Sequence, residues 1–293
     1  MNLLIIDRPG WHVNDLKRAA DSNLQITVAG YNELAASFTT SGDKRTGFRI
    51  ANQPIQSFDA ILIRAMPASS LEQIVFRMDA LNQIEKQFNI PIINPAKTIE
   101  SCVDKYLSLE LLRDCEIPVP ETSVAQTTEQ ALIFFEAMGK KSVVKPIFGS
   151  QGRGIELITS LDSAKQLFQR LESSGNVIYQ QRFVDHGDTD LRVLVVGSET
   201  FAVKRQRPGH WITNASQGAA CHRHELSLQE TTISLGAANS QGAFLAGVDI
   251  VYENGHPFVV EVNACPSWRH LSAALSTDVS AAVLYMISKL ASQ

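Results

Sequence analysis

The chain has 293 residues, of which 44% are hydrophobic and 19% are charged, and its formal net charge at pH 7 is −4. This composition is typical of a folded protein of two or three compact units, and the slight acidity argues against binding to nucleic acid. No apolar run approaches the roughly 18 residues of a membrane span. The four cysteines lack metal-ligand spacing, so we expect reduced thiols in a cytoplasmic protein.

The first 95 residues alternate strand-like and helix-like segments, which predicts a small parallel α/β domain. The apolar start of the chain ends at Asp7 without a preceding basic region, so it is expected to be a first strand and not a signal peptide. Further strands are expected at 24–29, 60–63 and 91–95, and helices at 13–21 and after Ser69 and Ser70. The second helix has an apolar face made of Leu71, Ile74, Val75, Met78, Leu81, Ile84 and Phe88.

Ligand contacts in this first domain are weakly indicated. No Gly-x-Gly-x-x-Gly follows the first strand, which disfavours a dinucleotide site. Arg64 ends the strand 60–63, at the edge where such sheets present ligand contacts. An ordinary surface arginine is the competing interpretation.

The central part of the chain carries a glycine-rich loop. Residues 96–118 look helical, and after them 142–158 read as strand, loop, strand, which excludes a Walker A loop because Gly154 runs into a strand. The glycines allow backbone N–H groups to close over phosphates. Lys145 lies in an otherwise apolar strand, and a buried ammonium needs an anionic partner. We therefore expect a phosphate there, although a plain hairpin tip is the alternative.

The remaining elements alternate between strands and helices up to the end of the chain. Strands are expected at 121–125, 177–184, 190–196 and 200–204, and helices at 131–138, 162–171, 228–239 and 279–290. The stretch 205–218 is too polar for a core and long enough to be a functional loop.

Two late strands, 246–252 and 258–263, carry oxygen-bearing side chains. Successive side chains of a strand alternate between its faces, so Glu261 and Asn263, two positions apart, project from the same face. Carboxylate and amide oxygens suit Mg²⁺ that arrives with substrate phosphates. A solvent-facing polar pair on an edge strand is the alternative.

Asp249 could be a third ligand, but the register of the hairpin decides. A regular two-residue turn at 254–255 would place Asp249 opposite Val260, on the wrong face. A three-residue loop or a β-bulge would pair Asp249 with Glu261 instead. The metal hypothesis therefore predicts one of these two irregularities.

In this order the motifs resemble the ATP-grasp superfamily and, within it, the RimK-type amino-acid ligases. The resemblance covers essentially the whole chain and rests on 104–106, 143–145 with 149–154, 190–193, 213–214, 247–249 and 261–264. The stretches 64–67, 71–79 and 266–271 resemble the branch that adds glutamate to tetrahydromethanopterin-type cofactors. The resemblance implies an α/β fold of three parts. These are a parallel N-terminal domain (1–95), a central lid subdomain (96–185) and a C-terminal subdomain with the metal site (186–293), and the last two enclose the nucleotide.

The resemblance also implies the site. ATP phosphates would meet Lys105, Lys145, the loop residues Gly149, Ser150, Gln151, Gly152 and Gly154, and Thr213, Asn214 and Ala215. Adenine would lie along Gln181, Arg182, Phe183 and Val184, and the ribose near Asp190. Arg205 would reach the transferring phosphoryl group, and Arg192 and Arg269 the acyl phosphate or substrate carboxylate. Asp249, Glu261 and Asn263 would carry two Mg²⁺ ions, which Mn²⁺ could replace.

Two positions depart from the family pattern. Arg182 stands where the adenine hinge usually has Glu, and Ile212 where a basic residue is frequent. The first change affects nucleotide contacts only through the side chain, since adenine recognition at a hinge is largely by backbone. The second puts the binding of a substrate anion near this loop in doubt.

The implied reaction is a carboxylate–amine ligation that depends on positioning and charge neutralisation. Its partners are small-molecule carboxylate and amine substrates, with no nucleic acid or membrane, and a homodimer is compatible with it. Two alternatives stay open: a ligase that adds glutamate to a protein tail, and an ATP-binding regulator without catalysis.

Overall fold

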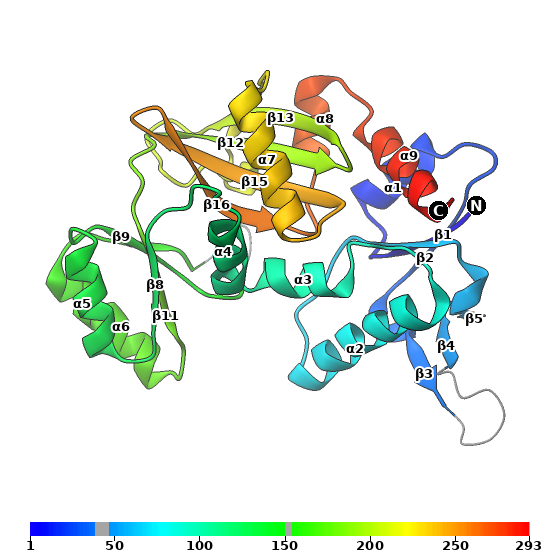
Figure 1. The fold of residues 1–293 in the computed structure, drawn as a ribbon, viewed down its shortest axis with the longest axis horizontal. Coiled ribbons are helices and arrows are strands. Elements are labelled where there is room, and N and C mark those ends of the chain that lie inside the picture. The colour runs from blue at the N-terminus through cyan, green and yellow to red at the C-terminus, as the bar shows by residue number, and fades with distance from the viewer. Residues whose placement is uncertain (39–46, 150–153, 293) are drawn as a thin grey trace.

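The computed structural model describes residues 1–38, 47–149 and 154–292, and within these ranges the strands form four sheets (Figure 1). Its first sheet is parallel throughout, in the order β2-β1-β6-β7. These strands are β1 (Asn2–Ile6), β2 (Gln25–Ala29), β6 (Ala60–Ile63) and β7 (Ile92–Ile93). The expected parallel N-terminal α/β unit is confirmed.

Helices cover both faces of this parallel sheet. On one face, Leu3 and Ile5 pack with α1 (Trp11–Ala19) and with the last helix of the chain, α9 (Val279–Ala291). On the other face, Leu4 and Ile6 pack with α2 (Leu71–Phe88) and α3 (Ala96–Val103). The C-terminal helix therefore returns to the first domain, and both ends of the chain lie close together in Figure 1.

The expected apolar face of α2 is only partly buried. Met78, Leu81 and Ile84 lie in the core, but Leu71 is 78% exposed and Val75 is 48% exposed. These two residues are exposed because the buried part of the helix begins at Arg77, so the first turn lies outside the core.

Several short elements were not predicted from the sequence, because they lack a clear hydrophobic period. A small sheet joins β3 (Ala35–Ser37), β4 (Gly47–Ile50) and β5 (Gln53–Pro54), and single turns of 3₁₀-helix lie at η1 (Tyr31–Glu33) and η2 (Ile55–Ser57). The 96–118 segment is not one helix but two. It breaks at Asp104, whose carboxylate accepts hydrogen bonds from the Tyr106 and Leu107 N–H groups and caps α4 (Lys105–Asp114).

The central sheet is antiparallel, in the order β10-β9-β11-β8. Its strands are β8 (Thr122–Ala125), β9 (Ser142–Lys145), β10 (Glu156–Ile158) and β11 (Ile178–Arg182). The helices α5 (Thr128–Ala137) and α6 (Leu161–Ser173) lie side by side against it, with Phe135 and Phe168 in their shared core (Figure 1).

The third large sheet is also antiparallel, in the order β14-β13-β12-β15-β16. It is built from β12 (Thr189–Val196), β13 (Glu199–Gln206), β14 (Ala220–Arg223), β15 (Leu245–Glu253) and β16 (His256–Asn263), with η3 (Ala215–Gln217) between β13 and β14. Helix α7 (Leu228–Ser240) packs on one face. The short helix α8 (Arg269–Leu275) and strand β14 were not expected from the sequence.

Asn94 joins the first sheet to the third. Its Nδ2 donates to the carbonyl oxygens of Leu245 and Ala264 at 2.6 and 2.7 Å, and its Oδ1 accepts from the Phe244 and Leu245 N–H groups. The Asn94 side chain is fully buried between the two sheets. The domain limits at residues 95 and 185 stay a prediction.

In the described ranges, no single helix has the length and apolar character to cross a membrane. Helices α8 and α9 have the necessary length and apolar character only when they are taken together, and this pair is bent by 114°.

Candidate active site

The hairpin β15–β16 carries a β-bulge where the metal hypothesis needs one. The turn has two residues, since Glu253 pairs with His256, yet Asp249 pairs with Glu261 and Ile250 with Val259. Val260 is therefore the extra residue of the bulge. The predicted irregularity is confirmed, and Asp249 and Glu261 lie directly opposite each other.

Two arginines hold Asp249. Its Oδ1 accepts a hydrogen bond from Arg192 Nη1 at 2.7 Å and lies 3.1 Å from Arg205 Nη2. Burial would raise the pKa of Asp249, but the two guanidinium groups outweigh it and lower that pKa. Gly247 leaves room for this arrangement, since a Cβ at this position would collide with the Arg192 guanidinium.

Arg205 is itself clamped by Asp190. Its Nε and Nη2 donate to the two Asp190 oxygens, at 2.7 and 2.5 Å. Burial would lower the pKa of Arg205, but the carboxylates of Asp249 and Asp190 outweigh it and raise that pKa. The carboxylate of Asp190, which was expected near the ribose, is therefore already bonded to Arg205.

The spacing of Asp190 and Arg205 along the sequence indicates this pair. The turn at Gly197-Ser198 has two residues, and counting back from Val196 opposite Glu199 in regular register places Asp190 opposite Arg205.

The two lysines expected near phosphate lie at the start of α4 and at the end of β9. Lys105 Nζ donates to the Gly149 carbonyl at 2.6 Å and lies 3.9 Å from Glu261 Oε1. Lys145 Nζ donates to Gln181 Oε1 at 2.8 Å. Burial lowers the pKa of Lys145 to about 8 despite the nearby Glu261 carboxylate. Within the described residues it makes no ion pair, so its ammonium still lacks a close anion.

Glu261 has the opposite problem. Burial and the facing carboxylate of Asp249 raise its pKa, and Lys105 and Lys145 only partly offset this. A cation or a cation-bearing phosphate would relieve the crowding of the two carboxylates.

Lys145 and Glu261 line a cavity between the central and the third sheet. Its apolar walls are formed by Val143, Ile155, Phe183, Val184, Ile212, Trp211, Val251 and Val260. Phe183 and Trp211 meet edge to face at 5.8 Å. Thr213 and Asn214 line it too, so the polar loop reaches this cavity as expected.

The hinge segment supplies one free donor to this cavity. The N–H groups of Arg182 and Phe183 bond to the carbonyls of Glu121 and Lys141. The Val184 N–H takes part in no hydrogen bond with any other described residue. The unusual Arg182 is paired with Glu253 at 2.9 Å, so its charge is neutralised by the β15–β16 turn.

A second cavity of about 290 Å³ opens beyond the carboxylates. Its lining comprises Arg192, Arg205, Asn214, Ala215, Ser216, Cys221, Asp249, Glu261, Asn263, Cys265, Ser267, His270 and Leu271, among others. It shares Arg205, Asn214, Asp249 and Glu261 with the first cavity. The acidic pair therefore stands at the junction of two spaces.

Three expected site residues lie outside what the structure describes. Ser150, Gln151 and Gly152 fall in the gap after Gly149. Arg269 is exposed and lines neither cavity, whereas its neighbours His270 and Leu271 line the second. Lys105, Gly149 and Gly154 line neither cavity either.

The oxygen donors fit Mg²⁺ only together with phosphate. The described residues contain no group of three or more His, Cys, Asp or Glu side chains placed to hold a metal. Asp249, Glu261 and Asn263 provide two carboxylates and one amide on adjacent strands. Mg²⁺ typically takes one or two protein carboxylates and completes its shell with substrate phosphates and water, which this set allows.

Comparison with known proteins agrees with this geometry. A family model described as a RimK-like ATP-grasp domain matches residues 102–287. The chain is 33% identical over 282 residues to a tetrahydromethanopterin:alpha-L-glutamate ligase of Methanococcus maripaludis, covering 94% of each chain. It is 31% identical over 240 residues to a probable alpha-L-glutamate ligase of Legionella pneumophila, covering 80% of this chain and 78% of the relative.

Solved structures agree on the fold. The ATP-grasp ligase PsnB, in complex with a minimal precursor, Mg and ADP, superposes with a TM-score of 0.76 at 17% identity and covers 99% of this chain and 97% of its own. D-alanine–D-alanine ligase from Bacillus anthracis, in complex with ATP, has a TM-score of 0.69 at 16% identity, with coverages of 99% and 96%.

Proposed function

Since the chain belongs to the RimK-like ATP-grasp family and is an ATP-dependent ligase, we propose that it adds L-glutamate or a similar amino acid to a cofactor precursor of the tetrahydromethanopterin type. The observation that carries this proposal is the pair Asp249 and Glu261 between two cavities. One cavity has apolar walls that suit a nucleotide base, and the other is lined by Arg192 and Arg205, which suit carboxylates.

The nucleotide would lie in the first cavity. Its base would pack between Phe183, Trp211 and Val251 and accept a hydrogen bond from the free Val184 N–H. Its phosphates would approach Lys145 and Lys105, and the glycine-rich loop between Gly149 and Gly154 would close over them. This placement would supply the anion that the buried Lys145 lacks.

The transfer would occur at the junction of the cavities. A substrate carboxylate in the second cavity attacks the γ-phosphorus of ATP, ADP leaves, and an acyl phosphate forms. The amine of the second substrate then attacks the acyl carbon, phosphate leaves, and an amide forms with loss of a proton. Arg205 and Arg192 would stabilise the negative charge on the transferred group.

Asp249, Glu261 and Asn263 would hold Mg²⁺, in two sites, with Mn²⁺ as a substitute. The ions would neutralise the phosphate oxygens. Asp190 would act by fixing the guanidinium of Arg205, because the two-point contact prevents its rotation.

The test is product analysis. The purified protein is incubated with ATP, MgCl₂, L-glutamate and a panel of pterin precursors, and ADP release and product masses are measured. We expect ADP only when both substrates are present, and a product heavier by one glutamyl residue. ADP release with peptide tails alone would favour a protein-tail ligase, and nucleotide binding without turnover on either panel would favour a regulator.

A further inference from the structure

Arg64 is a buried arginine without a polar partner. Its side chain is 6% exposed, and its Nε and Nη1 have no hydrogen-bond acceptor. Among the described residues it forms no ion pair, and burial lowers its pKa. The surface-arginine interpretation from the sequence is therefore wrong. Since buried donors are nearly always satisfied, the unpaired guanidinium indicates a missing acceptor.

Arg77 shows what a buried arginine of this domain looks like when it is purely structural. It is 8% exposed and lies 5.0 Å above the Tyr31 ring. Unlike Arg64, it donates to the Pro67 carbonyl, to Ser69 and to Gln73. Arg77 therefore provides a matched control within the same domain.

The position of Arg64 in the sheet favours a ligand. It directly follows β6, whose neighbour β1 lies between β6 and β2. The connection from β1 leads to β2 through α1 on one face, and that from β6 leads to β7 through α2 on the other. The strand order therefore reverses between β1 and β6, and ligands of open parallel sheets bind at such a point, beyond the carboxyl ends of the strands.

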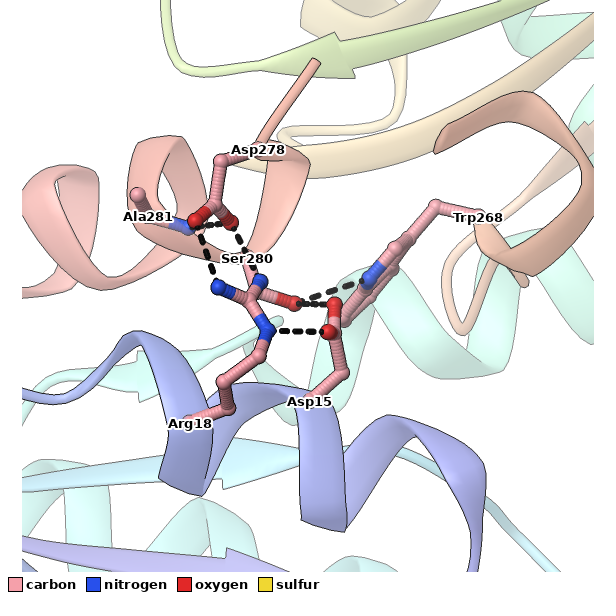
Figure 2. A network of polar contacts seen from close by, with 6 residues as sticks. All are labelled: Asp15, Arg18, Trp268, Asp278, Ser280 and Ala281. Atoms are coloured by element: carbon pink, nitrogen blue, oxygen red, sulfur yellow. Dashed lines mark hydrogen bonds and ion pairs between the residues drawn. The ribbon is translucent and has the colours of Figure 1, made fainter. Parts of the chain in front are cut away.

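Trp268 forms a rigid floor under Arg64. The Arg64 guanidinium lies 4.2 Å from the centre of the indole ring, which is fully buried. Figure 2 shows how the indole is fixed: its Nε1 donates to Ser280 Oγ, and this hydroxyl donates to Asp15. Arg18 then joins Asp15 on α1 to Asp278 at the start of α9 (Figure 2).

None of the residues that the structure describes places an anion close enough to neutralise Arg64. Asp7 at the end of β1 acts only at a distance, and its Oδ1 accepts from the Arg8 N–H. His12 contacts the edge of Trp268 at 4.8 Å and is neutral, because burial and the charges of Arg64 and Arg269 lower its pKa to about 3. Arg64 therefore has no close anionic partner among the described residues.

The second cavity begins next to this place. The Cys265 thiol contacts the carbonyl of Ile63, the residue before Arg64, at 3.6 Å. Cys265 lines that cavity together with Asn263, two residues earlier. Arg64 itself lines neither cavity, so the contact between Ile63 and Cys265 is what places it beside the second cavity.

We propose that Arg64 binds a carboxylate of a substrate, one that does not react, and so makes the first domain part of the substrate site. The planar guanidinium with unused donors matches a carboxylate, and its stacking on Trp268 fixes its plane. This inference rests on the proposed function, since it takes the second cavity to be the place of the acid and amine substrates.

The test compares Arg64→Met and Arg64→Lys with Arg77→Met. For Arg64→Met we expect a melting temperature equal to or above that of the wild type, because a buried unpaired charge is removed. KM for one carboxylate substrate should rise about 10- to 100-fold, the range for a lost charge-assisted hydrogen bond, while KM for ATP stays unchanged. Arg64→Lys should restore KM only partly. Arg77→Met should lower the melting temperature and leave every KM unchanged.

The two possible sources of the carboxylate separate in the same assay. A rise in KM for L-glutamate assigns Arg64 to the amine substrate, and a rise in KM for the pterin assigns it to the acid substrate. Unchanged values for both, or a loss of stability like that of Arg77→Met with no change in KM, would overturn the proposal.

A binding assay keeps the inference separate from the proposed function. Glutarate, a dicarboxylate without an amine, should raise the melting temperature of the wild type and of Arg77→Met but not of Arg64→Met. This result would support Arg64 as a carboxylate site even if L-glutamate and pterins were not turned over. If the protein ligates glutamate but Arg64→Met changes neither the KM values nor the glutarate response, the proposed function stands and the carboxylate site is refuted.

Discussion

Asp249 and Glu261 lie directly opposite each other on β15 and β16, because Val260 is bulged out of the ladder between them. In a regular hairpin with the same two-residue turn, Val260 would face Asp249 and the two carboxylates would lie on different faces. The bulge thus creates an acidic pair that is costly in the free protein, where each carboxylate disfavours the charge of the other.

Glu261→Gln should separate the metal role from a structural one. The amide keeps the shape but removes a charge, so we expect kcat for ligation to fall about 10²- to 10³-fold and the Mg²⁺ concentration for half-maximal activity to rise. ADP production is measured across a MgCl₂ series. His256→Gln, at the exposed end of the same strand, is the control, and an unchanged Mg²⁺ dependence in Glu261→Gln would contradict a metal role.

The clamp between Asp190 and Arg205 should appear as non-additivity. In Arg205→Lys the ammonium group cannot bind both oxygens of Asp190 and the Asp249 carboxylate at once, so kcat should fall by about 10²-fold. Asp190→Asn should have a smaller effect, and the double variant should lose less than the sum, with a coupling of about 1–3 kcal/mol. Steady-state rates of the four proteins give this cycle, and strictly additive losses would mean that Asp190 does not position Arg205.

The helices and strands with a strong hydrophobic pattern could be predicted from the sequence. Features that depend on strand register or on contacts between distant segments could not. The buried strands of the first sheet follow from continuous apolar runs, and Lys145 in β9 correctly suggested a partly buried ammonium. The bulge was predicted only as one of two options, since the length of the loop does not determine how the ladder closes.

Contacts between distant segments were beyond the sequence. Nothing near Arg64 indicates that Trp268, 204 positions later, would lie under its guanidinium. Which residues of α8 line the second cavity likewise depends on how this helix packs on the sheet, and a single sequence does not show that packing. Residue types predicted the chemistry of the site, and only packing located its members.

Lys145→Met should stabilise the free protein and weaken nucleotide binding. The pKa of Lys145 is about 8 in the folded protein and 10.5 unperturbed, so the cost of burying the ammonium is fully present below pH 8. It disappears as the pH rises from 8 to 10.5. At about 1.4 kcal/mol per pKa unit, the variant should be more stable at pH 7 by up to about 3 kcal/mol.

Urea unfolding at pH 7 and pH 10.5, together with ADP titration, measures both effects of Lys145→Met. Lys141→Met, from the exposed residue that precedes β9, is the matched control for stability. If Lys145→Met were less stable at pH 7 and bound ADP normally, the lysine would be structural.

Asn94→Asp should destabilise the junction of the first and third sheets. The new carboxylate oxygen would face the carbonyl oxygens of Leu245 and Ala264 and leave both without a donor. A buried acceptor without a partner costs about 1–3 kcal/mol, so we expect a loss of about 2–5 kcal/mol in the free energy of unfolding. Asn89→Asp, at the exposed end of α2, should change it by less than about 0.5 kcal/mol, and equal effects of the two would refute the role of Asn94.

His12 should make the protein sensitive to acid. Its Nε2 accepts hydrogen bonds from the backbone N–H of Trp268 and from the Ser267 hydroxyl, so the ring proton lies on Nδ1 and protonation would break both contacts. Burial, with the charges of Arg64 and Arg269, lowers the pKa of His12 from 6.5 to about 3. The unfolded chain therefore binds the proton first, and the stabilisation, complete above pH 6.5, is lost as the pH falls from 6.5 toward 3.

His12→Gln keeps an acceptor without a titrating group. Between pH 7.5 and pH 4.5 the wild type should lose about 2–3 kcal/mol more free energy of unfolding than this variant, at about 1.4 kcal/mol per pKa unit below 6.5. Urea unfolding at both pH values measures the difference, and His222→Gln on the exposed strand β14 should behave like the wild type. Since His12 touches the segment that carries Trp268, its protonation would also loosen the floor under Arg64, so KM for the carboxylate substrate should rise in acid in the wild type and not in His12→Gln. Parallel pH profiles for the two proteins would show that the ring does not titrate in this range.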